Sequence, residues 1–191
     1  MLPSYSRRNP GPDVIAISTL LSLIAACAPL VAADTAQALI AVESAGNPFA
    51  IGVVGGALVR QPRSLDEALA TTAALDAAGW DYSVGLGQIN KRNFGRLHLT
   101  VEQAFMPCAN LGAMQVILTE CFGRASQRGS TRPNQQVALR DALSCYYSGN
   151  FTTGHRHGYV GKVVSAWVTV HAPIYSSQSA QSLQGDPSPR R

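Results

Sequence analysis

The sequence predicts a mainly helical protein with a small β excursion, arranged around one central helix. Apolar residues recur at helical spacing in several segments, and paired capping residues mark several helix starts. The clearest apolar face begins at Cys108 and continues through Leu111, Met114, Leu118 and Cys121. Residues 51–59 differ, because a glycine pair between β-branched runs is typical of a short hairpin.

Length and composition indicate one globular domain with tails. The chain has 191 residues, of which 46% are hydrophobic and only 14% charged, so a real core is expected. We assign residues 27–172 to the domain, 1–26 to an N-terminal segment and 173–191 to a disordered polar tail. The net charge of +4 favours an anionic partner, such as a wall polymer or a membrane surface. Nucleic acid is not expected, because no basic run is interleaved with aromatic residues.

The N-terminal segment has two interpretations, which the sequence leaves open. Residues 14–28 contain no charge, a length that suits a signal-peptide core and is too short for a membrane span. This segment would then be a signal or anchor that contacts the membrane. Cleavage after Ala33 would however remove Cys27 and leave an odd number of cysteines. The alternative is a first buried helix at residues 15–26.

The next helix is predicted to cover residues 34–43. Asp34 with Gln37 has the pattern of a capping box, and Gly46 with Pro48 supplies stop signals. One face of the helix carries Ala36, Leu39, Ile40 and Glu43. The last member of this apolar stripe is therefore a carboxylate.

Glu43 is the candidate acid of the chain. In the last turn of a core-facing helix, burial and the negative end of the helix dipole both favour its protonated form. A carboxyl group that stays protonated near neutral pH can act as a general acid. The alternative is a glutamate that ends the helix and reaches solvent.

The remaining elements follow from capping and periodicity. Residues 64–67 form a second capping box, which opens a helix to about Ala78. Residues 80–90 are expected to be irregular, and Thr100 with Gln103 opens a short helix that Pro107 ends. After the central helix and a polar loop at 126–134, further helices are predicted at 137–146, ending by Gly149, and at 158–171.

The four cysteines lack the paired spacing of a zinc site or a redox motif. Cys108 and Cys121 on one helix would lie roughly 20 Å apart and so cannot pair with each other. Two disulfides would link Cys27 and Cys145 to that helix in one of two ways, which favours an oxidising compartment. The alternative is four buried thiols.

Two further segments have the composition of a binding site. In residues 83–90, glycines let the backbone approach a ligand, and the amides of Gln88 and Asn90 suit hydroxyl and N-acetyl groups. In residues 145–150, two tyrosines precede a Ser-Gly-Asn turn, and such aromatic faces suit sugar rings. Solvated amides and an ordinary helix end are the alternatives. The pair His155 and His157 has no neighbouring acid or cysteine, so no metal or cofactor is expected.

These motifs, in this order, resemble family-one lytic transglycosylases with a lysozyme-like domain. The matching motifs are Glu43-Ser44, residues 85–90, residues 146–150 and Tyr159-Val160. Residues 107–111 and 118–121 are similar to the small transglycosylases of type IV secretion and conjugation systems. The resemblance implies a lysozyme-like fold, action on peptidoglycan glycan strands in the periplasm or cell envelope, and secretion-system components as partners.

The resemblance also implies roles for single residues. Glu43 would be the one catalytic acid and base, which protonates the bond between N-acetylmuramic acid and N-acetylglucosamine. As a carboxylate it would then accept the proton of the muramyl 6-hydroxyl while a 1,6-anhydro ring closes. Tyr147 would help to orient Glu43 or the N-acetyl group. The substrate-binding residues would be Ser83, Gln88, Asn90, Tyr147, Asn150 and Tyr159.

One departure from the family pattern affects the third motif. The usual Ala-Tyr-Asn-Ala-Gly is replaced here by Tyr147-Ser148-Gly149-Asn150 after Tyr146. Two other functions remain as alternatives. One is a true hydrolase that uses Asp81 to position water, because ordinary glycoside hydrolysis needs a second carboxylate. The other is a non-catalytic protein that binds the wall during assembly.

Overall fold

The structure is a computed structural model, which describes residues 14–128 and 134–171. The described helices are α1 (Ile17–Cys27), α2 (Ala33–Glu43), α3 (Leu65–Ala77), α4 (Val101–Phe105), α5 (Pro107–Ser126), α6 (Gln135–Ser148), α7 (Thr153–Arg156) and α8 (Tyr159–His171). Strands β1 (Ile51–Val53), β2 (Tyr82–Val84) and β3 (Ile89–Asn90) form one antiparallel sheet in that order, followed by the 3-10 helix η1 (Lys91–Asn93). The predicted fold class, mainly helical with a small sheet, is confirmed.

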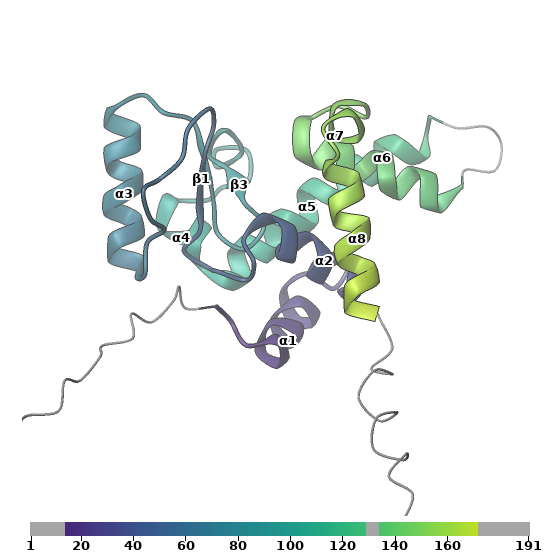
Figure 1. Ribbon diagram of the computed structural model, residues 1–191, viewed down its shortest axis with the longest axis horizontal. Coiled ribbons are helices and arrows are strands. Elements are labelled where there is room, and N and C mark those ends of the chain that lie inside the picture. The colour runs from purple at the N-terminus through teal and green to yellow at the C-terminus, as the bar shows by residue number, and fades with distance from the viewer. Residues whose placement is uncertain (1–13, 129–133, 172–191) are drawn as a thin grey trace, which may run out of the picture.

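The helices and the sheet form two lobes joined by α2 and α5 (Figure 1). One lobe contains the sheet, α3 and α4, and the other contains α6, α7 and α8. The long helix α5 is central, as predicted, because its apolar face is part of the core and the helix packs against α1, α4 and α6. Leu111, Met114, Leu118 and Cys121 are all buried there.

Two disulfides fix neighbouring helices to α5. Cys27 pairs with Cys108, which joins the end of α1 to the start of α5. Cys121 pairs with Cys145, which joins α5 to α6. The structure therefore selects one of the two pairings that the sequence left open. The first bridge therefore holds α1 against α5. The second holds α6, which carries Tyr146 and Tyr147, against α5.

The segment before Cys27 folds as a helix of the domain. Leu20 and Ile24 of α1 are buried against the core, and α1 packs on α2 and α5. This arrangement corresponds to the second of the two interpretations given above. Within residues 14–128 and 134–171, no helix has the length and apolar character needed to cross a membrane. Removal of this segment stays a prediction that the fold does not test.

The predicted N-cap of α2 is wrong. The helix begins at Ala33 with Ala32 as its N-cap, and Asp34 lies within the first turn. The Asp34 carboxylate accepts a hydrogen bond from the Trp167 indole N–H at 2.9 Å, so it joins α2 to α8 instead of capping the helix. Its charge still lies near the positive end of the α2 dipole.

The predicted hairpin within residues 51–59 is also wrong. Strand β1 pairs with β2, with Ile51 opposite Val84 and Gly52 opposite Ser83. The other edge of β1 is occupied by the Gln61 amide, which donates to the Ile51 carbonyl at 3.0 Å and accepts from its N–H at 2.8 Å. The segment 80–90, expected to be irregular, therefore contains two strands.

Two other predicted helix starts are confirmed, one of them in part. The Ser64 side chain accepts from the Glu67 N–H at the start of α3, but the Glu67 carboxylate accepts from the Arg63 N–H, so only half of this predicted capping box is present. Thr100 with Gln103 forms a complete capping box on α4. Helix α6 ends at Gly149, whose φ of 76° is the left-handed conformation that glycine adopts at little cost. The end of α6 lies next to Tyr147 and Ser148, which line the space between the lobes.

Candidate active site

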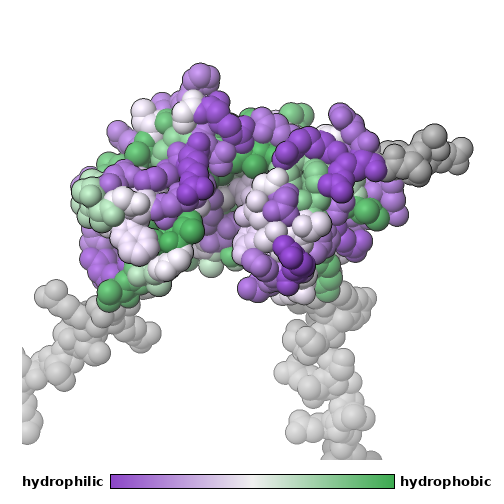
Figure 2. Space-filling view, turned by 90° about the horizontal axis from the view of Figure 1, so that it is seen from above, coloured by the Kyte–Doolittle hydropathy of each residue, from purple (hydrophilic) through white to green (hydrophobic). Residues whose placement is uncertain are grey.

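A cavity of about 800 Å³ lies between the two lobes. In the view from above, the surface is hollowed there and its rim is largely hydrophilic (Figure 2). Side chains from both lobes line this space, which we call the Glu43 cavity. They include Glu43, Asp81, Ser83, Gln88, Asn90, Tyr146, Tyr147 and His157.

Glu43 is the last residue of α2, and its carboxyl group faces the Glu43 cavity. The rest of the predicted face, Ala36, Leu39 and Ile40, is buried in the core. Burial raises the pKa of Glu43 from 4.5 to about 7, and a hydrogen bond from the Tyr159 hydroxyl to Glu43 Oε1 opposes this rise. At neutral pH the side chain is therefore present in both its protonated and its ionised form.

Tyr159 is the partner of Glu43. It is buried at the start of α8, and burial together with the nearby Glu43 raises the pKa of its hydroxyl. The phenol therefore stays protonated and can donate to the Glu43 carboxylate. Tyr146 also lies close to Glu43, and burial raises its pKa as well.

The glycine-bearing loop between β2 and β3 is held by the buried side chain of Asn110 on α5. Its Oδ1 accepts from the Gly87 N–H at 2.7 Å, and its Nδ2 donates to the carbonyls of Val84 and Ala104 at 2.9 and 2.7 Å. Gly85 has a φ of 77°, and a Cβ there would lie 2.2 Å from Asn110 Nδ2. The loop thus needs glycine because this amide occupies the space.

Sequence reasoning missed Asn110 as a residue that shapes the site. The available signal was an amide on the apolar face of α5, four residues before Met114. A buried amide needs hydrogen-bond partners, and they come from the backbone of Val84 and Gly87 and from Ala104 of α4. Tyr146 adds a second tie, because its hydroxyl donates to the Gly87 carbonyl.

The structure places Gln88, Asn90 and Ser83 together along the Glu43 cavity. Gln88 has a positive φ of 48°, and its Nε2 donates to the carbonyls of Ala50 and Gly85 at 3.1 and 3.0 Å. Asn90 lies opposite Ser83 in the sheet, and its Nδ2 lies 3.4 Å from Ser83 Oγ. Their contact with a substrate stays a prediction.

Asp81, the other carboxylate of the Glu43 cavity, already has two partners. Its Oδ1 accepts from Asn90 Nδ2 at 3.1 Å, and its Oδ2 forms an ion pair with Arg92 at 2.8 Å. Only about a fifth of the Asp81 side chain is exposed. Each oxygen therefore already has one partner, and the ion pair holds the carboxylate toward Arg92.

Tyr147 is linked to Glu43 indirectly, because its ring stacks on Tyr159, which donates to Glu43. The two tyrosine rings stack with centroids 4.6 Å apart, and the Tyr147 hydroxyl lies 3.3 Å from His157 Nδ1. Tyr147 is 46% exposed at the rim of the Glu43 cavity. Tyr159 is thus the tyrosine that donates to Glu43, while Tyr147 stacks on the Tyr159 ring; a role of Tyr147 toward Glu43 or the N-acetyl group stays a prediction.

The structure places Asn150 outside the lining of the Glu43 cavity. Its Oδ1 accepts from the N–H groups of Thr152 and Thr153, so the side chain shapes the turn before α7. His155 pairs with Asp141, and His157 turns to Tyr147, so the two histidines do not converge. In the part of the chain that the structure describes, no three metal-ligating side chains form a cluster.

Comparisons with known proteins agree on one family. The model of the transglycosylase SLT domain matches residues 21–164. The type IV secretion system protein virB1 of Brucella abortus biovar 1 (strain 9-941) is 48% identical over 160 residues, covering 81% of this chain and 66% of that protein. Protein virB1 of Agrobacterium fabrum is 39% identical over 152 residues, covering 78% and 59%. The chain thus spans less than two thirds of the length of each of these curated relatives, and no solved structure matches it.

Proposed function

The chain belongs to the transglycosylase SLT domain family, and from its Glu43 cavity we propose that it is a peptidoglycan lytic transglycosylase. It would cleave the β-1,4 bond between N-acetylmuramic acid and N-acetylglucosamine and leave a 1,6-anhydromuramyl end. The observation that carries the proposal is the carboxyl group of Glu43, which lines a cavity large enough for sugars and has a pKa of about 7.

Protonated Glu43 begins the proposed reaction. It donates its proton to the glycosidic oxygen while the bond from this oxygen to the muramyl C1 breaks. The positive charge that develops at C1 is stabilised by the acetamido oxygen of the same sugar. A general acid works best when its pKa lies near the working pH, which is the position that burial gives to Glu43.

Ionised Glu43 completes the reaction. Its carboxylate accepts the proton of the muramyl 6-hydroxyl while O6 forms a bond to C1. The proton that Glu43 lost is thereby returned, and no water is consumed. Tyr159 holds the carboxylate through its hydroxyl in this second step. One titrating group with access to both forms near neutral pH is enough for both proton transfers.

We assign the binding of sugar substituents to the residues around Glu43. Ser83, Gln88 and Asn90 bring hydroxyl and amide groups to the sheet side of the Glu43 cavity, where N-acetyl and hydroxyl groups can pair with them. On the opposite side Tyr147 presents an exposed ring, which suits the apolar face of a sugar.

A transglycosylase fits the geometry better than a hydrolase. A hydrolase would need a second carboxylate free to act on water or on the sugar. Asp81 is the candidate, but its two oxygens are bound by Asn90 and Arg92. The intramolecular attack of the 6-hydroxyl needs no such group.

Mass spectrometry of digested peptidoglycan sacculi tests the proposal. The wild type should release muropeptides with 1,6-anhydro ends, each one water lighter than the corresponding reducing end. Glu43→Gln should release none while it still binds sacculi. Reducing ends would support the hydrolase alternative, and undiminished release by Glu43→Gln would contradict the role of Glu43. No release by the folded wild type would favour the wall-binding alternative.

The biological setting is proposed from the relatives. Two relatives named virB1 match more than three quarters of this chain, and the name of one describes it as a type IV secretion system protein. The two disulfides agree with an oxidising compartment such as the periplasm. The enzyme would open the wall locally for a secretion or conjugation apparatus. A strain that lacks its own virB1 should regain transfer with the wild-type gene and not with Glu43→Gln.

A further inference from the structure

A groove extends from the Glu43 cavity over α5 and α6. The two spaces share a wall, which is lined by Asn93, Ile117, Tyr146 and Gly149. The groove measures about 690 Å³, and its far part is lined by Arg96, Glu120 and Arg124. We call it the arginine groove. Because the two spaces adjoin along these four residues, the arginine groove lies within reach of a substituent on a sugar bound beside Glu43.

The charges of the arginine groove do not balance. Arg96 Nη1 lies 3.2 and 2.9 Å from the two carboxylate oxygens of Glu120, so these charges neutralise each other. Arg124 contacts the Cys121–Cys145 sulfur atoms and faces the Phe151 ring. Among the residues that the structure describes, no carboxylate forms an ion pair with Arg124.

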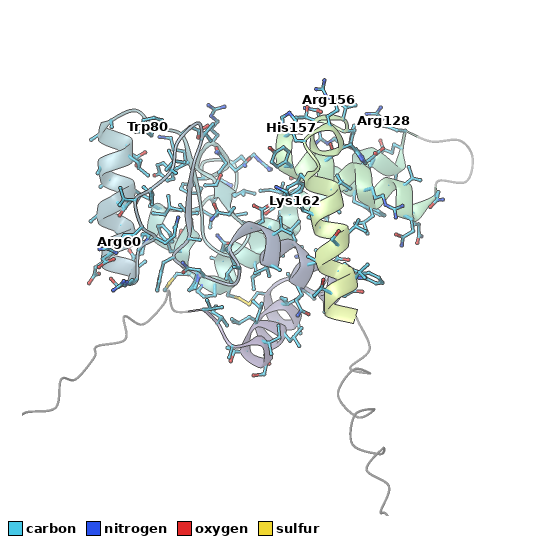
Figure 3. The ribbon with its side chains drawn as sticks, viewed as in Figure 1. Arg60, Trp80, Arg128, Arg156, His157 and Lys162 are labelled. Atoms are coloured by element: carbon cyan, nitrogen blue, oxygen red, sulfur yellow. A yellow bond between two sulfur atoms is a disulfide. The ribbon has the colours of Figure 1, made fainter. Side chains whose placement is uncertain are left out.

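A second arginine increases the positive charge beside the groove. The guanidinium of Arg128 lies 4.4 Å from the centre of the Phe151 ring, and that of Arg124 lies 5.7 Å from it. Arg128 also has no ion-pair partner within the described ranges, and residues 129–133 contain no acidic residue. Figure 3 shows Arg128 on the same upper side of the α6 and α7 lobe as Arg156 and His157.

Two guanidinium groups on one aromatic ring repel each other unless an anion joins them. The planar fork of arginine pairs especially well with a carboxylate, and the ring holds the forks in place. The positive charge is not needed for the proton transfers of Glu43, because none of the described contacts joins Arg124 to Glu43. The pair thus has the composition of a carboxylate site next to the reaction centre.

We propose that the arginine groove binds a carboxylate of the stem peptide carried by the muramyl sugar. This inference rests on the proposed function. The sugar rings themselves offer hydroxyl and N-acetyl groups, and the lactyl group is joined to the peptide by an amide. The free carboxylates of a strand therefore belong to its peptides. The enzyme should prefer glycan strands that still carry peptides over bare strands.

The test compares three substrates that share the same glycan strands. The first carries intact peptides, the second carries peptides whose carboxylates have been amidated, and the third has lost its peptides to an amidase and has had the lactyl carboxylates exposed by that cleavage amidated as well. Anhydro ends released at low ionic strength give kcat/KM for each. For the wild type we expect the first substrate to be cleaved about fivefold faster than the other two, because a partly exposed ion pair contributes about this much.

The variant Arg124→Gln should cleave all three substrates at the rate that the wild type shows on the amidated one. Arg60→Gln removes the same charge from the opposite lobe, where Figure 3 places it away from the arginine groove, and should keep the wild-type preference. Added salt should reduce the wild-type preference, because it screens exposed charges.

Several results would overturn the inference. Equal wild-type rates on intact and amidated peptides would do so, as would an Arg124→Gln protein that slows on all three substrates by one factor. If circular dichroism shows that Arg124→Gln is unfolded, Arg128→Gln replaces it, and an unchanged preference in that variant counts against the site. Absence of anhydro ends from every substrate would instead overturn the proposed function and this inference with it.

Discussion

Replacing Glu43 by glutamine should make the protein more stable at neutral pH, because the native carboxyl group is costly to ionise. Burial raises the pKa of Glu43 from 4.5 to about 7. Between these two values the folded protein holds a proton that the unfolded chain has released, so the free energy of unfolding falls as pH rises. At about 1.4 kcal/mol for each pH unit, the total loss is about 3 kcal/mol.

The glutamine variant has no carboxyl group to ionise at this position and lacks this loss. Urea unfolding of the disulfide-bonded proteins measures the free energy of unfolding of each. The value for Glu43→Gln minus the value for the wild type should increase by about 3 kcal/mol between pH 4 and pH 8. Urea is uncharged and leaves the electrostatics intact. Glu102→Gln, at an exposed position on α4, controls for the loss of one negative charge. A difference between wild type and Glu43→Gln that does not change with pH would refute the reasoning.

Three more predictions concern the groups around Glu43. Tyr159→Phe removes the hydrogen bond that lowers the Glu43 pKa, so the fall of activity at alkaline pH should move upward by roughly one pH unit. Tyr147→Phe should not move this alkaline fall of activity. An equal shift in the two variants would contradict the assignment of Tyr159 as the hydrogen-bond partner of Glu43. Asn110→Ala leaves three buried backbone groups without a partner and should lower the free energy of unfolding by about 3 kcal/mol in urea. The surface change Gln127→Ala serves as the control. Equal free energies of unfolding for Asn110→Ala and Gln127→Ala would refute this prediction. Reduction of Cys27–Cys108 and Cys121–Cys145 should cost about 3 to 5 kcal/mol each, seen as a lower Tm, and an unchanged Tm would contradict a stabilising role.

The position of the Glu43 carboxyl group at the end of a core-facing helix was predictable because it depends on local periodicity. Glu43 ends the same apolar stripe as Leu39 and Ile40, and a helix places such residues on one face whatever surrounds it. The buried face of α5 and the capping box of Thr100 with Gln103 followed for the same reason. Each of these features is decided within a few residues of chain.

Long-range contacts account for the predictions that were wrong. The β1 strand pairs with a strand about 30 residues later, and Gln61 bonds to its other edge. Asp34 bonds to Trp167, which is 133 residues away, and so does not cap its own helix. Whether Tyr147 or Tyr159 meets Glu43 depends on how α6 packs on α8, which no spacing in the sequence reveals.

The charge state of Glu43 is the claim on which both proton transfers depend. Carbon-13 NMR of the glutamate side-chain carboxyl groups, with the Glu43 signal identified by its absence in Glu43→Gln, measures this state directly across a pH titration. The account predicts a midpoint near 7 for Glu43 in the free protein. A midpoint near 4.5, the ordinary value for a glutamate in water, would contradict it.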